Sequence, residues 1–123
     1  MTRFRVRFFK STAPEAPGLR KGWIRMLVAF SVAPSGGAQA GDSVSEAVAA
    51  AVRVVRESGL PNRTDAMFTT IEGTWEECFD VVRRATEAVG EYGSRVSLVL
   101  KADIRPGYTG ELDAKLERLE SHL

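Results

Sequence analysis

Two helix-start motifs, separated by a run of strand-type residues, constrain the fold of this 123-residue chain most strongly. Residues 43–46 (Ser-Val-Ser-Glu) and 74–77 (Thr-Trp-Glu-Glu) each place a hydroxyl residue three positions before a glutamate, the capping-box spacing that satisfies free amides at a helix start. Apolar residues then recur every three or four positions, which predicts one buried face on each helix. Gly59 predicts the end of the first helix, and Gly90 and Gly93 predict the end of the second.

Runs of apolar and β-branched residues indicate strands before, between and after these helices. The first run covers residues 27–33 and is expected to stop at Pro34. Residues 62–73 suit either two short strands that turn near residues 65–68 or one long bent strand. Residues 95–105 predict a long last strand. A short terminal helix is indicated by leucines at helical spacing, namely Leu112, Leu116, Leu119 and Leu123.

The order β-α-β-β-α-β plus a terminal helix is that of the ferredoxin-like α+β fold, in which two helices cover one face of a four-stranded antiparallel sheet. Alternation along the last strand places Val99, Lys101 and Asp103 together on one side. The first strand is apolar on both sides. A face that mixes aliphatic residues with a few polar groups is poorly suited to water. We therefore expect the open face and the leucine edge of the terminal helix to be buried against another subunit.

The formal net charge of +1 is the sum over two segments of opposite net charge. Residues 1–25 carry seven basic residues and one acidic residue, whereas residues 26–123 carry 10 basic and 15 acidic residues. We expect residues 1–25 to be a disordered extension, or upstream sequence before a true start at Met26, and residues 26–123 to form one domain. The alternative for the first segment is a basic arm that binds nucleic acid or an anionic surface.

The single cysteine and the single histidine limit the chemistry of the chain. One cysteine excludes an intrachain disulfide framework and a multi-cysteine zinc site, and Cys78 is expected to be a small core residue on the second helix. His122 lies next to the C-terminal residue, which argues against a histidine-dependent catalytic triad. No apolar run approaches the roughly 20 residues that span a bilayer.

Three segments resemble one known family, the small thiamine-binding proteins of ferredoxin-like fold. They are residues 58–60 (Ser-Gly-Leu), 67–73 (Met-Phe-Thr-Thr-Ile-Glu-Gly) and 101–105 (Lys-Ala-Asp-Ile-Arg). The family's middle segment runs Met-Gly-Thr-x-Ile-Glu-Gly, so Phe68 replaces its glycine, and Ile104 stands where the family often has a second aspartate. The resemblance implies a cytoplasmic homo-oligomer, commonly a tetramer of paired dimers. Such a protein binds thiamine or its hydroxymethylpyrimidine part and has no established catalytic activity.

The chemistry of thiamine fits residues in and near these segments. Its aminopyrimidine pairs with a carboxylate, which Glu72 or Asp103 can supply. Hydroxyl groups can fix the polar edges of the ligand, and a methionine with Phe30 or Phe68 can cover its ring faces. No metal and no cofactor other than thiamine as the ligand is expected. The expected ligand-binding residues are Ser31, Met67, Thr69, Thr70, Glu72, Lys101 and Asp103.

Structural roles and other functions remain open at this point. Glu72 can complement the start of the second helix, and Asp103 can pair with Arg105 at a strand end. An enzyme that uses Glu72 and Asp103 as an acid–base pair is one alternative function, and a structural oligomer without a ligand is another. Nucleic-acid binding is not favoured, because the acidic domain lacks a basic field and aromatic residues at fixed sites on two central strands. The expected function is non-catalytic binding of thiamine, with no nucleic-acid or membrane partner.

Overall fold

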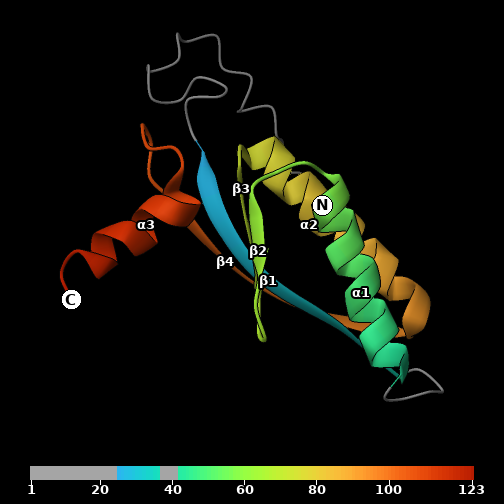
Figure 1. Cartoon of the computed structure of the whole chain (residues 1–123). Coiled ribbons are helices and arrows are strands. Elements are labelled where there is room, and N and C mark those ends of the chain that lie inside the picture. The colour runs from blue at the N-terminus through green and yellow to red at the C-terminus, as the bar shows by residue number, and fades with distance from the viewer. Residues whose placement is uncertain (1–24, 37–41) are drawn as a thin grey trace, which may run out of the picture.

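The structure is a computed structural model that describes residues 25–36 and 42–123 (Figure 1). Its strands form one antiparallel sheet in the order β2-β3-β1-β4. The expected ferredoxin-like βαββαβ arrangement with a further C-terminal helix is confirmed. Residues 1–24, most of the expected extension, lie outside the described residues. The elements in chain order are β1 (Met26–Ser35), α1 (Asp42–Glu57), β2 (Asn62–Thr64), β3 (Thr69–Gly73), α2 (Trp75–Val89), the 3-10 helix η3 (Gly90–Tyr92), β4 (Arg95–Ile104) and α3 (Glu111–Glu120).

Helices α1 and α2 cover one face of the sheet, whereas α3 lies on the other side (Figure 1). The core fills the space between the sheet and the two covering helices. Burial alternates along β1, because Val28 and Phe30 are buried, whereas Ala29 between them and Leu27 before them are only half-buried. Helix α2 contributes every residue that its apolar stripe predicts, namely Cys78, Val81, Val82, Ala85 and Val89. Helix α1 contributes Ala47, Ala51 and Val55. The prediction for α1 is partly wrong, because Val44 and Val48, also expected on its buried stripe, are each 41% exposed.

Strand β1 runs two residues further than the sequence predicts, through Pro34 to Ser35. The expectation that Pro34 ends the strand is wrong, because this part of β1 has a neighbouring strand on one side only. Strand β3 pairs only with residues 26–30 of β1, so residues 31–35 have β4 as their one strand neighbour. A proline is tolerated where one side of a strand is free of ladder hydrogen bonds, as on an edge strand.

Of the two alternatives for residues 62–73, the structure has the two short strands. The β2–β3 turn is closed by the amide of Asp65, which donates to the carbonyl of Phe68 at 2.9 Å. The second capping box is confirmed: the amide of Glu77 donates to Thr74 Oγ1 at 3.2 Å, and the amide of Thr74 donates to Glu77 Oε1 at 3.0 Å. The strand that carries Thr70 and Glu72 is therefore followed immediately by a well-capped helix.

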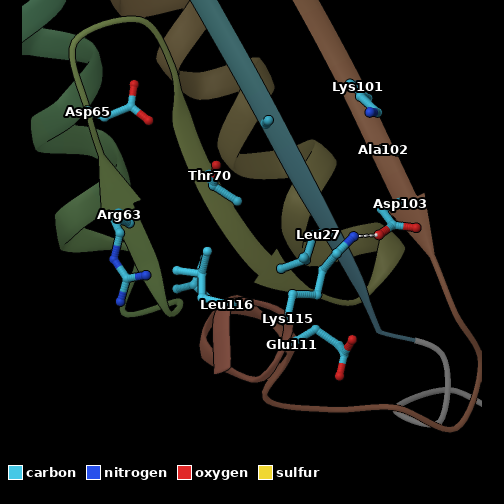
Figure 2. Close-up of a pocket in the computed structure, with 12 residues that line it drawn as sticks. Leu27, Arg63, Asp65, Thr70, Lys101, Ala102, Asp103, Glu111, Lys115 and Leu116 are labelled. Carbon is cyan, nitrogen blue, oxygen red and sulfur yellow. Dashed lines mark hydrogen bonds and ion pairs between the residues drawn. The ribbon is translucent and has the colours of Figure 1, made fainter. Parts of the chain in front are cut away.

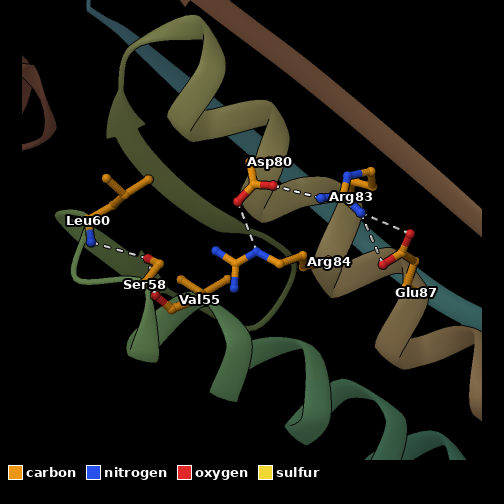
Figure 3. A network of polar contacts seen from close by, with 7 residues as sticks. All are labelled: Val55, Ser58, Leu60, Asp80, Arg83, Arg84 and Glu87. Carbon is orange, nitrogen blue, oxygen red and sulfur yellow. Dashed lines mark hydrogen bonds and ion pairs between the residues drawn. The ribbon is translucent and has the colours of Figure 1, made fainter.

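The end of α1 and the exposed side of α2 are held by local hydrogen bonds (Figure 3). Gly59 has a φ of 80°, the left-handed conformation predicted for the residue that stops α1. Helix α1 begins at Asp42, one residue before the predicted capping serine, whose side chain lies outside the described residues. On α2, Asp80 accepts hydrogen bonds from Arg83 and Arg84. None of the helices in the described part of the chain is long and apolar enough to cross a membrane.

Candidate functional site

Helix α3 and the uncovered face of the sheet enclose a cavity of about 550 Å³ (Figure 2). Its floor is one row of residues that runs across all four strands. The register pairs Arg63 with Thr70, Thr70 with Ala29, and Ala29 with Lys101, so side chains from β2, β3, β1 and β4 lie side by side. The short side chain of Ala29 stands in the middle of this row. The other lining residues are Leu27, Asp65, Ala102, Asp103, Glu111, Leu112, Lys115 and Leu116.

The walls of this cavity are partly apolar and partly charged. Its apolar side chains include Leu112 and Leu116 from α3 and Leu27 from β1. Three basic side chains and three acidic side chains also line it, so the charges of the lining balance. A cavity of this size, with an apolar surface and a few converging polar groups, has the general character of a small-molecule site. The charged lining residues are Arg63, Lys101, Lys115, Asp65, Asp103 and Glu111.

Asp103 of β4 lines the cavity and is paired with α3. Its Oδ2 forms an ion pair with Lys115 of α3, and Oδ1 has no hydrogen-bond partner among the described residues. The hydrogen bond from Lys115 lowers the pKa of Asp103, and the charges of Lys101 and Arg105 lower it further. Asp103 is therefore an ionised acceptor at neutral pH, with one oxygen available to a donor group.

Glu72 lies on the same face of the sheet but is covered by α3. It is only 2% exposed, and its two carboxylate oxygens accept hydrogen bonds from the amides of Glu111 (3.1 Å) and Leu112 (3.3 Å). The Nε of Arg25 lies 3.8 Å from one of these oxygens. The sequence allowed Glu72 to complement the start of a helix, and it does so for α3 rather than for the adjacent α2.

The predicted site residues fall into separate places. Thr70, Lys101 and Asp103 line the cavity beneath α3. Glu72 does not line this cavity and is covered by the start of α3. The other three, Ser31, Met67 and Thr69, line a smaller cavity of about 180 Å³ between α1 and the β2–β3 turn.

This second cavity offers few free polar groups. Thr69 is buried, and its hydroxyl lies 3.0 Å from that of Thr64. Met67 is 73% exposed at the tip of the turn. Phe30 belongs to the core, while Phe68 is half-buried beside the turn. With a volume below the usual range for ligand pockets, this cavity is the weaker candidate.

Several lining residues were not predicted from the sequence. Arg63 could have been found, because strand alternation and pairing with Thr70 put it on the open face. Lys115 and Leu116 lie on α3, and no local signal indicates where that terminal helix docks. The sequence predicts a turn at Asp65 rather than a site residue. In the structure its carboxylate accepts hydrogen bonds from the amides of Met67 and Phe68 within that turn.

Cys78 has no part in either cavity. It is fully buried in the core, and this burial raises the pKa of its thiol to about 12, with the charge of Glu77 adding to the effect. The expectation of a small core residue is confirmed. Among the residues that the structure describes, no group of three or more histidine, cysteine or acidic side chains is placed to hold a metal ion.

The sequence matches the family model described as thiamine-binding protein over residues 28–120. A UPF0045 protein of Mycobacterium bovis is 54% identical over 99 residues, which cover 80% of this chain and 94% of that protein. The matched region contains every predicted site residue.

Solved structures show the same fold. A domain of unknown function from Bacillus cereus is 33% identical, with a TM-score of 0.63 over 72% of this chain and 85% of that one. A hypothetical protein of Methanocaldococcus jannascii is 29% identical, with a TM-score of 0.69 over 78% of this chain and 96% of that one.

Proposed function

Because the chain belongs to the family of thiamine-binding proteins, we propose that it binds thiamine or its hydroxymethylpyrimidine part in the cavity beneath α3, and changes none of the ligand's bonds. The observation that carries this proposal is the composition of that cavity. It combines leucine side chains from β1 and α3 with a row of polar side chains on the sheet and an ionised aspartate that has one free oxygen.

The polar groups of the cavity match the edges of an aminopyrimidine. The free Oδ1 of Asp103 can accept from the amino group, while Thr70 and Lys101 can donate to a ring nitrogen. Leu27 and Leu116, which both line the cavity, can pack against the flat faces of the ring. The carboxylates of the lining can attract a cationic thiazolium ring locally, although three basic residues balance their charge.

Catalysis by Glu72 and Asp103 is not part of the proposal. Glu72 is buried, and its oxygens already accept two backbone amides. The pKa of Asp103 is lowered by Lys115, which makes it a poor proton donor near neutral pH. Asp103 therefore lacks the proton affinity, and Glu72 lacks the access, that acid–base chemistry requires.

We also propose that the protein is a cytoplasmic homo-oligomer, as its family resemblance implies. The open face supports this proposal, because Val99 on β4 is 55% exposed and Leu119 on α3 is 54% exposed. Both apolar side chains lie on the side of the sheet away from the core.

Isothermal titration of the full chain with thiamine, and separately with hydroxymethylpyrimidine, tests the proposed ligand. We expect heat of binding and a rise in melting temperature, because a ligand that binds only the folded state stabilises it. If millimolar ligand produces neither heat of binding nor a rise in melting temperature, the proposed function is wrong.

Variants test the proposed place of binding. Asp103→Asn keeps the shape of the side chain but removes its charge, and should weaken binding by about tenfold or more, the effect of losing a hydrogen bond to a charged group. Glu87→Gln is the matched control, since Glu87 is an exposed carboxylate of α2 paired with Arg83 on the opposite side of the sheet (Figure 3). Equal affinity of both variants and the unmodified chain would place the ligand elsewhere.

A further inference from the structure

Helix α3 has no N-terminal cap of its own. The residue at its cap position is Gly110, which has a φ of 67° and no side chain to accept hydrogen bonds from the first turn. The amides of Glu111 and Leu112 donate instead to Glu72, which lies 39 and 40 residues earlier in the chain. The start of α3 is thus completed by a carboxylate of strand β3.

Two further polar contacts attach α3 to the sheet, and both are exposed. Lys115 forms an ion pair with Asp103, and Asp113 accepts a hydrogen bond from Arg63 at 2.7 Å. Exposed ion pairs of this kind contribute little to stability. The contact through Glu72 is different, because it is buried and charge-assisted.

The same helix supplies one whole wall of the cavity. Glu111, Leu112, Lys115 and Leu116 all line it, and Leu116 lies toward the sheet in the close-up view (Figure 2). A displacement of α3 would remove these four side chains together. The cavity is therefore complete only while α3 is docked.

We propose that Glu72 is a positioning residue: it holds α3 over the cavity, so ligand affinity depends on a carboxylate that does not touch the ligand. This inference rests on the proposed function for its effect on affinity. From strand β3, Glu72 caps the start of α3, whereas Asp103 and Thr70 contact the ligand directly. Loss of the cap lowers the fraction of molecules with α3 docked, and apparent affinity falls in proportion to that fraction.

Hydrogen exchange of the full chain, measured beside thiamine titration, tests this role. In Glu72→Gln we expect the amides of residues 114–118 to exchange about five- to tenfold faster, the size of effect expected for one helix cap. Amides of β1 and β4 should be unchanged. The Kd for thiamine should rise, but by no more than that factor, because affinity falls only with the fraction of molecules in which α3 is docked. Glu77→Gln makes the same change at the start of α2, where glutamine can also complete a capping box, and should alter neither α3 exchange nor Kd.

Each contrary result has a distinct meaning. Unchanged α3 exchange in Glu72→Gln overturns the proposal, and a raised Kd beside it would mean that Glu72 binds the ligand directly. Faster α3 exchange with an unchanged Kd also overturns it. If the unmodified chain binds no thiamine, the proposed function fails, while exchange without ligand still decides whether Glu72 holds α3.

A measurement on the unmodified chain covers the case in which Glu72→Gln does not fold. Saturating thiamine should slow exchange in α3 more than in the exposed turn of residues 65–68. Equal exchange of α3 with and without bound ligand would rule out its role as a wall of the occupied site.

Discussion

Asp103 of β4 is paired with Lys115 of α3, and both side chains line the cavity. Its hydrogen bond with Lys115 lowers its pKa, so any stability it contributes is present above the usual carboxyl pKa and is lost as pH falls through the lowered value. Both side chains are about half exposed, with 47% of Asp103 and 49% of Lys115 accessible, so this contribution is small. The pKa of Asp103 therefore reports on this ion pair more clearly than a measurement of stability does.

We predict that Lys115→Met raises the pKa of Asp103 toward its usual value, because the strongest cause of the lowering is removed. Lys101→Met should raise it less, since Lys101 acts only through its charge. Carboxyl-carbon NMR titration of Asp103 in the three proteins measures both effects. An equal rise in the two variants would show that the ion pair with Lys115 does not form in solution.

The sequence indicates which residues are polar and functional more readily than it indicates which groups they contact. Glu72 was expected either to bind the ligand or to complement a nearby helix, and the helix that it caps is 39 residues further along the chain. That partner depends on where α3 docks. Alternation along the last strand puts Lys101 and Asp103 on one face of the sheet, as the sequence predicts. Thr70 joins them in the cavity because β3 and β4 both pair with β1.

Among the elements, the helices were predicted best, because their signals are local. The capping box at Thr74 and the left-handed Gly59 both lie within a few residues of the helix ends that they define. The end of β1 was missed, because tolerance of Pro34 depends on which strands lie beside it. Strand limits are set by neighbours that are distant in sequence.

The junction between α2 and β4 offers a matched pair of glycine substitutions. Gly90 has a helical φ of −60°, and an added Cβ would have no atom closer than Val96 Cγ2 at 3.9 Å. A Cβ at Gly93 would lie 2.6 Å from the backbone oxygen of Ser35. We predict that Gly90→Ala raises the free energy of unfolding by about 0.4–1 kcal/mol, since alanine restricts the unfolded chain.

Gly93→Ala should lower the same free energy by about 1–3 kcal/mol, because β1 must shift away from the new methyl group. Urea unfolding of both variants at one temperature gives the comparison. Similar stability of the two variants would mean that β1 and the start of β4 are further apart than this structure has them.

At the scale of the whole molecule, the open face is the surface that the expected oligomer would bury. Strand β4 presents Val99 there, beside Ser31 of β1. We predict that the unmodified chain sediments as a homo-oligomer at micromolar concentration, and that Val99→Glu shifts it to a smaller species by burying an unpaired charge.

Val44→Glu is the control, because Val44 is 41% exposed on α1, on the opposite side of the sheet. It should leave the oligomer intact. Sedimentation velocity distinguishes these outcomes, and a monomeric unmodified chain would contradict the proposed assembly.

The cavity and the core lie on opposite faces of the same sheet. Along β1, Val28 and Phe30 pack against the helices, while Ala29 between them forms the cavity floor. A substitution at Ala29, Thr70 or Lys101 thus alters the size or charge of the cavity without touching the packed helical layer. Proteins with this fold can change what they bind by varying every second residue of a few strands, so selection on ligand choice and selection on folding act on separate sets of positions.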